Sequence, residues 1–193
     1  MMPLTAIHEE TRQLLLRYQD YFPTAPRFAT LARQLASGED LFARSNMTGH
    51  VTASAAVLNE DGGKILLIEH VFLQRRLVPG GHYEAPGCLL DSALREVREE
   101  TGAYAVAPHP WTLRHGVPLD VDSHPIPANP NKGEGAHWHH DFMFLAVAQE
   151  NDVLTAQLEE VHGAAWHPLS VLAALDDARL RRVHERLTHG GLI

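Results

Sequence analysis

The sequence contains a single cysteine, Cys88, among its 193 residues. One thiol excludes an internal disulfide framework and is typical of proteins from reducing compartments. Cys88 precedes a helix-like run, and a helix dipole can lower the pKa of a nearby thiol. We favour the simpler interpretation, in which Cys88 is a small packed residue.

The chain also lacks long apolar runs and an excess of basic residues. No stretch approaches the roughly 18 apolar residues of a membrane-spanning helix, and Glu9 and Glu10 interrupt the region where a signal peptide would be apolar. The net charge is -8 with histidine neutral, which argues against general binding to nucleic-acid backbones. We therefore expect a soluble, cytoplasmic protein with no membrane partner.

Hydrophobic residues make up 45% of the chain, enough for one sizeable core and an added element. Residues 1–47 have apolar positions at helical spacing, interrupted at Pro23 and Pro26, and they predict a helical N-terminal extension. We expect this extension to pack on the domain formed by residues 48–193. The alternative is that its apolar stripes form a homodimer interface.

Residues 48–193 mix strand-like and helix-like patterns. Alternation in residues 49–59 and 64–71, around the turn at 61–63, predicts a hairpin. Further strands are expected at 104–107, 112–117, 142–148 and 164–166, and closing helices near 170–175 and 177–188. This order predicts an α/β fold with a mixed sheet between helices.

The most informative segment runs from Gly80 to Ala103 and reads GGHYEAPGCLLDSALREVREETGA. An apolar stripe predicts that much of it is helical; its members are Leu90, Ala93, Leu94 and Val97. At about 100° per residue, Glu96, Glu99 and Glu100 fall on one face, where like charges oppose the helix. Acids on a helix face are usually just solvated, but a hard divalent cation would relieve this repulsion. The segment therefore predicts a metal site.

This segment resembles the signature of the Nudix hydrolases. The matching positions are Gly81, Arg95, Glu96, Val97, Glu99, Glu100 and Gly102, with Ala103 as a small stand-in for the last aliphatic residue. The departure is Gly87, which stands where the family carries a glutamate that mainly braces the arginine. We expect Glu84 or Asp91 to brace Arg95 in its place. The alternative is that the loop around Gly87 is held less tightly.

The resemblance implies an α/β/α sandwich and hydrolysis of a diphosphate linked to another moiety, with Mg²⁺ or Mn²⁺ as cofactor. It implies that Glu96, Glu99 and Glu100 bind the metal, and that Arg95 orients them and is catalytic together with Glu99 and Glu100. Gly80 and Gly81 would let the backbone approach the helix and contribute to substrate binding. The general base is left open; the candidates are Glu99, Glu100, Glu134, Glu159 and Glu160.

Residues 118–141, PLDVDSHPIPANPNKGEGAHWHHD, read as a long functional loop. Together with residues 49–54 they resemble a Nudix subgroup with poorly defined substrates. We expect His82, His137 and His139 to bind substrate at the pocket mouth. On a strand, His137 and His139 would share a face while His140 points away. A zinc site formed by His137, His139, His140 and Asp141 is the alternative.

The expected function is a metal-dependent pyrophosphohydrolase acting on a nucleotide-type small molecule, with ADP-ribose-like compounds as the first guess. Pro118, at a distance from the signature typical of ADP-ribose-cleaving members of the family, is a weak pointer to them. Two other classes remain open. Gly87 favours a nucleotide-binding or regulatory module with little turnover, and the histidine-rich segment favours a zinc-dependent hydrolase.

Overall fold

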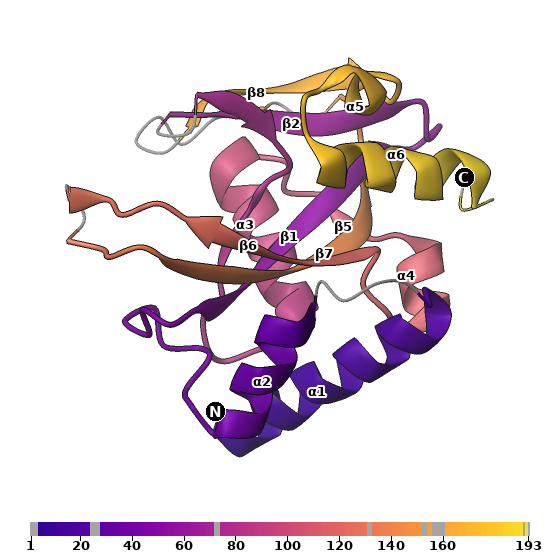
Figure 1. Cartoon of the computed structure of the whole chain (residues 1–193). Helices are drawn as coiled ribbons and strands as arrows, with labels where there is room; N and C mark the ends of the chain where they lie inside the picture. Colours follow the sequence, from indigo (N-terminus) through magenta and orange to yellow (C-terminus); the bar gives the residue numbers. More distant parts are fainter. Residues whose placement is uncertain are drawn as a thin grey trace.

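The computed structural model (Figure 1) describes most of the chain; the described residues are 4–23, 28–71, 74–130, 133–151, 154–155, 161–190 and 192. Within these residues, eight strands form one sheet. The strands are β1 (His50–Asn59), β2 (Lys64–His70), β3 (Arg75–Leu77), β4 (Gly80–His82), β5 (Ala107–Pro108), β6 (Asp120–Ile126), β7 (His137–Ala148) and β8 (Val161–Pro168).

Strand β1 is the centre of this sheet. It runs parallel to β7, with His50 opposite His139 at one end and Asn59 opposite Ala148 at the other. It is antiparallel to β2 and β4, and β6 is antiparallel to β7. The sheet is therefore mixed, and the predicted α/β class is confirmed.

Helices cover both faces of the sheet. They are α1 (Leu4–Tyr21), α2 (Ala29–Ser37), α3 (Leu89–Thr101), α4 (Pro110–His115), α5 (Val171–Ala174) and α6 (Ala178–His189). Helices α1, α2 and α3 pack on the face that carries Val51 and Ala53 of β1, and α4, α5 and α6 pack on the face that carries Ala56 and Leu58. Figure 1 shows α1 and α2 on the opposite side of the sheet from α5 and α6.

The predicted helical extension contains α1 and α2, and its apolar side chains join the main core. Tyr18 and Leu31 are almost completely buried in the same cluster as Val51, Val97 and Phe142. Burial of this kind is the dominant favourable term in folding. The apolar stripe therefore packs within the chain, and the division at residue 47 stays a prediction.

The prediction of a strand at 112–117 is wrong, because residues Pro110–His115 form helix α4. The sequence carries every local signal for this helix. His109 accepts a hydrogen bond from the backbone of Trp111, Pro110 occupies the first turn, and Gly116 ends the helix in the left-handed conformation at φ 61°. Of the strand predicted at 104–107, only residue 107 is in β5.

The prediction of one long loop at 118–141 is wrong for half of the segment, because residues 120–126 belong to β6 and residues 137–141 belong to β7. Pairing with β1 reaches back to His139 of β7, and pairing with β6 extends the strand to His137. Pro125 is compatible with β6 because this strand pairs with β7 alone among the described residues, and proline is tolerated on such edge strands. Tertiary pairing thus forms strands at the two ends of the segment, whereas the described residues among 127–136, where most of the prolines, asparagines and glycines stand, lie outside the named strands.

None of the helices in the described part of the chain is both long enough and apolar enough to cross a membrane.

Candidate active site

The acidic helix α3 begins and ends as its sequence predicts. Cys88 is its N-cap and forms a capping box with Asp91. Gly102, at φ 72°, ends the helix and donates its N–H to the carbonyl of Arg98. Burial raises the pKa of the Cys88 thiol, which fits a capping residue rather than a reactive cysteine.

Arg95 gathers two of the three predicted metal ligands. Its Nη2 lies 2.7 Å from Oε1 of Glu96, and its Nη1 donates to Glu99. The same Nη2 donates to the carbonyl oxygen of His82 at 3.0 Å. The guanidinium therefore ties both carboxylates to the end of β4, and its fork geometry suits this role.

Glu100, the third predicted ligand, is held by the glycine turn. Its side chain is 4% exposed, and its Oε2 accepts the backbone N–H of Gly80 at 2.9 Å. The three acids of the helix therefore differ in exposure, because Glu100 is buried, Glu96 is partly buried and Glu99 is exposed. Burial raises the pKa of Glu96, and the charge of Arg95 opposes that rise.

Gly81 lies against the carboxylate of Glu96. A Cβ added to Gly81 would stand 2.5 Å from both Cδ and Oε1 of that side chain. We therefore expect Gly81→Ala to displace the Glu96 carboxylate and to lower kcat by about 10- to 100-fold, since small misplacements in a site cost that much. The measurement is kcat as a function of Mg²⁺ concentration.

The matched control is Gly63→Ala, because nothing lies within 4 Å of a Cβ at that glycine. The control is expected to keep wild-type turnover. Equal activity of the two alanine variants would contradict a role for the close approach of β4 to α3.

The brace for Arg95 is Glu84 rather than Asp91. Glu84 Oε1 lies 3.9 Å from Arg95 Nη2, whereas Asp91 accepts hydrogen bonds from the backbone N–H and the thiol of Cys88. Glu84 is exposed, so this contact is weak. Gly87 has a φ of +149°, a conformation that side chains rarely adopt, so a glutamate at this position would be strained in this loop.

The candidates for a general base outside the helix differ in their surroundings. Glu134 is partly buried and pairs with Arg44, with its Oε1 2.9 Å from Nη2. Glu159 and Glu160 lie outside the described residues. Glu99 has 49% of its side chain exposed, so a water molecule can reach it.

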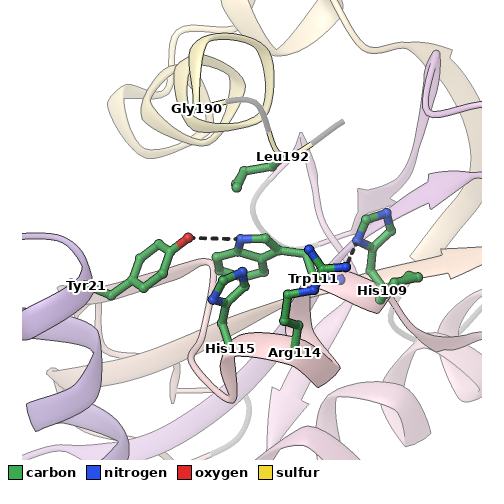
Figure 2. Close-up of a pocket in the computed structure, with 8 residues that line it drawn as sticks. Tyr21, His109, Trp111, Arg114, His115, Gly190 and Leu192 are labelled. Atoms are coloured by element: carbon green, nitrogen blue, oxygen red, sulfur yellow. Dashed lines mark hydrogen bonds between the residues drawn. The ribbon is translucent and has the colours of Figure 1, made fainter.

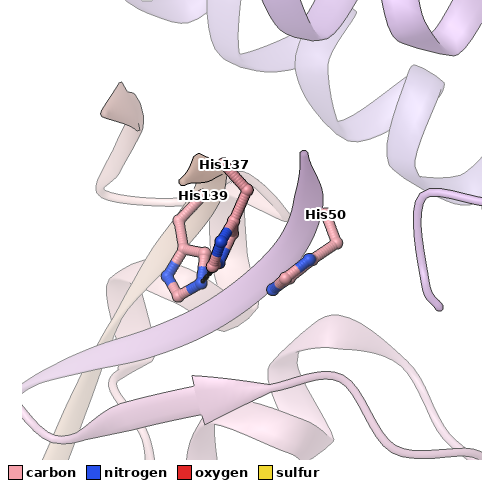
Figure 3. A group of neighbouring side chains, drawn as sticks. All are labelled: His50, His137 and His139. Carbon is pink, nitrogen blue, oxygen red and sulfur yellow. Dashed lines mark hydrogen bonds between the residues drawn. The ribbon is translucent and has the colours of Figure 1, made fainter. Parts of the chain in front are cut away.

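The three histidines predicted to bind substrate lie together, and a fourth joins them. His82 Nε2 is 2.9 Å from Nε2 of His50, and His137 Nε2 is 3.1 Å from Nε2 of His139. Figure 3 shows His50 on β1 facing His137 and His139 on β7. Sequence reasoning missed His50 as a site residue because only the β1–β7 register brings it to His139.

Three of these rings are poor bases in their present surroundings. Burial lowers the pKa of His82 to about 3 and that of His139 to about 2. Burial also lowers the pKa of His50. His50, His82 and His139 are therefore neutral at physiological pH, the form in which imidazole binds metals.

The zinc ligand set proposed from the sequence is wrong in two of its four members. His140 points to the other face of the sheet, where its ring nitrogens lie 2.6 Å from Gln34 Oε1 and 2.8 Å from Ser123 Oγ. Asp141 accepts hydrogen bonds from Thr52 and Ser54. The alternation of β7 thus separates His140 from His137 and His139, as the sequence predicts for a strand.

Sequence reasoning also missed a buried ionic network beside the histidines. Asp120 is fully buried, and its carboxylate accepts hydrogen bonds from the guanidinium groups of Arg179, Arg182 and Arg186 on α6. Arg179 also donates to Asp141 at 2.7 Å. The three arginines are spaced so that they fall on one face of a helix, and this spacing is the trace of the network in the sequence. Their partner, Asp120, lies on β6, far away along the chain.

A pocket of about 310 Å³ lies elsewhere, between α4, the end of α1 and the C-terminal residues. Figure 2 shows Trp111 at its centre, with the hydroxyl of Tyr21 3.3 Å from the indole Nε1. The lining residues are Tyr21, His109, Pro110, Trp111, Arg114, His115, Gly190 and Leu192. None of them belongs to α3, β4 or the histidine group, so this pocket is separate from the candidate active site.

The fold and the acidic helix together define a Nudix domain. The family model described as the NUDIX domain matches residues 48–187, which is more than half of the chain. The chain therefore belongs to the Nudix family, and it is a hydrolase of pyrophosphate bonds.

A curated relative supports this membership. It is a protein of Lactococcus lactis subsp. cremoris (strain MG1363) named "Probable DHNTP pyrophosphohydrolase", 36% identical over 123 residues that span 64% of this chain and 69% of the relative.

Two solved structures show the same fold. The first is a binary complex of a C. elegans Ap4A hydrolase, with a TM-score of 0.53 and 16% identity over 74% of this chain and 96% of that one. The second is a Nudix-family hydrolase from Clostridium perfringens, with a TM-score of 0.52 and 23% identity over 72% and 95%. At these identities the likeness concerns the fold alone.

Proposed function

We propose that the chain is a divalent-metal-dependent pyrophosphohydrolase of a nucleotide-type small molecule, with its centre at α3. The observation that carries this proposal is the arrangement of three carboxylates around one arginine and one glycine turn. Arg95 holds Glu96 and Glu99, and Gly80 holds Glu100.

The residues present fit a hard divalent cation. Glu96, Glu99 and Glu100 offer carboxylate oxygens, the donors that Mg²⁺ and Mn²⁺ prefer. When bound, such an ion neutralises phosphoryl oxygens and lowers the pKa of an attacking water. This also explains how a protein of net charge -8 accommodates an anionic substrate.

The chain's own residues supply positioning and proton transfer. The fork of Arg95 holds Glu96 and Glu99 in fixed orientations, with the charge of Arg95 opposing the rise in the pKa of Glu96. Glu99 is the exposed member, so we assign it the acceptance of a proton from the attacking water. Glu100 is buried and bound to the glycine turn, and a ligand so fixed reduces the reorganisation needed during the reaction.

For the substrate, the relative at 36% identity favours DHNTP, the compound in its name. DHNTP therefore replaces the ADP-ribose-like compounds, which the sequence favoured, as the first proposed substrate. His82 is the proposed substrate contact among the histidines, because it follows Gly81 directly and its carbonyl oxygen binds Arg95.

The test is turnover of a substrate panel by metal-free protein and by protein with added Mg²⁺ or Mn²⁺. The panel contains DHNTP, ADP-ribose, nucleoside triphosphates and dinucleoside polyphosphates, and the measured product is pyrophosphate or nucleotide. We expect turnover only with metal, and fastest with DHNTP. Tight binding of these compounds without turnover at any metal concentration would instead support the binding-module alternative that Gly87 favours.

A further inference from the structure

Four imidazole rings meet where β1, β4 and β7 lie side by side. His50 and His137 are 1% and 5% exposed, and their rings stack with centroids 4.7 Å apart. The ring of His139 lies 4.8 Å from that of His50 and 5.0 Å from that of His137. Such a concentration of buried imidazole is unusual because each ring leaves polar nitrogens that need partners.

Backbone carbonyls decide which nitrogen of two rings carries the proton. Nδ1 of His50 lies 3.2 Å from the carbonyl oxygen of Asn46, and Nδ1 of His137 lies 2.7 Å from that of Gly135. A carbonyl only accepts, so both Nδ1 atoms are donors. With the proton on Nδ1, Nε2 of each ring offers a lone pair, and these two atoms face Nε2 of His82 and Nε2 of His139 inside the group.

We propose that His50, His137 and His139 form a binding site for a borderline transition-metal ion such as Zn²⁺, separate from the carboxylate site on α3. One ligand nitrogen from each of these residues lies within 4.8 Å of the others. Ligands about 2.0–2.1 Å from a tetrahedral ion are about 3.3 Å apart. The 3.1 Å between Nε2 of His137 and Nε2 of His139 meets this spacing, and the wider separations in the group, up to 4.8 Å, have to shorten when an ion binds. Carbonyl-bound Nδ1 atoms are also the usual outer shell of metal-binding histidines.

Three protein ligands leave a fourth position for water or another donor. The ring of His82 lies on this side, 4.8 Å from that of His50 and 5.3 Å from that of His139. Because the carbonyl oxygen of His82 binds Arg95, an ion held here fixes the strand ends that position the arginine. The site uses other donor atoms than the carboxylate site, since imidazole favours zinc-like ions and carboxylates favour magnesium.

The test is titration of metal-free protein with Co²⁺, followed by visible absorption, and then displacement by Zn²⁺. We expect one Co²⁺ per chain to show the intense absorption of tetrahedral coordination, and Zn²⁺ to displace this tetrahedral Co²⁺ completely. In His139→Ala, the affinity for Co²⁺ is expected to fall by at least about 100-fold, more than the loss of an outer-shell partner costs.

Two controls distinguish this site from others. His162→Ala removes an exposed histidine of β8 and should keep the wild-type affinity. Glu99→Gln should also keep it, because the carboxylate site takes no part. Absence of tetrahedral Co²⁺ binding by the wild type, or its loss in Glu99→Gln, would overturn the proposal.

A second measurement does not depend on the folding of a variant. In the wild-type protein, the ¹⁵N shifts of Nε2 of His50 and His137 should move on addition of one equivalent of Zn²⁺, while those of His162 stay in place. Unchanged shifts at His50 and His137 would show that the rings are only hydrogen-bonded to their neighbours, and would refute the site.

Discussion

Glu99→Gln is expected to lower turnover at least about 100-fold while leaving the fold intact. Proton transfer by a positioned side chain contributes roughly 10²- to 10⁴-fold to a rate, and the amide can neither accept that proton nor ligate a metal as a carboxylate does. The substitution keeps the size of the side chain, and Glu99 is exposed, so the free energy of unfolding should change little. The measurement is kcat/KM with Mg²⁺, with urea unfolding as the check on stability.

The matched control for this prediction is Glu60→Gln. Glu60 is an exposed residue at the turn between β1 and β2, so the same chemical change there should leave kcat/KM unaltered. A Glu99→Gln variant with wild-type turnover would exclude Glu99 as the base, and Glu100 and Glu134 would then be the next bases to test.

Asp120→Asn is expected to reduce the free energy of unfolding by about 3–5 kcal/mol, the cost of breaking a buried ion pair by removing one partner. Asp120 is fully buried and pairs with Arg179, Arg182 and Arg186 at 2.7–2.9 Å. Asparagine retains the size but loses the charge and one pair of acceptor sites. The three guanidinium groups would then remain buried beside a neutral side chain, which offsets less of the cost of removing their charges from water.

Urea unfolding measures this effect as a lower midpoint with an unchanged slope. The matched control is Asp176→Asn, since Asp176 is fully exposed and lies 3.8 Å from Arg181. An exposed pair of that kind contributes about 0–1 kcal/mol. Equal midpoints for the two variants would mean that the network on α6 adds no stability beyond packing.

The acidic helix was accessible from the sequence because its signals are local. The apolar stripe through Ala93, Leu94 and Val97 indicates which face is buried, and Gly102 indicates where the helix ends. The relation of Glu96 to Glu99 follows from helical geometry alone. Arg95 and the glycine turn are close enough in sequence that the same short segment contains both.

Helix α4 shows that local signals can be present and still be outweighed in a sequence-based interpretation. Residues 112–117 alternate enough to suggest a strand, yet His109, Pro110 and Gly116 together specify a short capped helix. The β6–β7 pair shows the opposite case. Its histidines and Pro125 stand in a segment whose composition is typical of a loop, and only the pairing of β6 with β7, and of β7 with β1, places these residues in strands.

By itself the sequence determined the family and the class of reaction, and it predicted that three carboxylates share one face of α3, because each depends on residue types at fixed spacing within one helix and one turn. Only the tertiary structure decided that His50 joins His137 and His139, and that Asp120 meets Arg179, Arg182 and Arg186. The physical reason is register. A strand presents alternate residues to one face, so the partners across β1, β7 and α6 are set by pairing and packing between segments far apart in the chain.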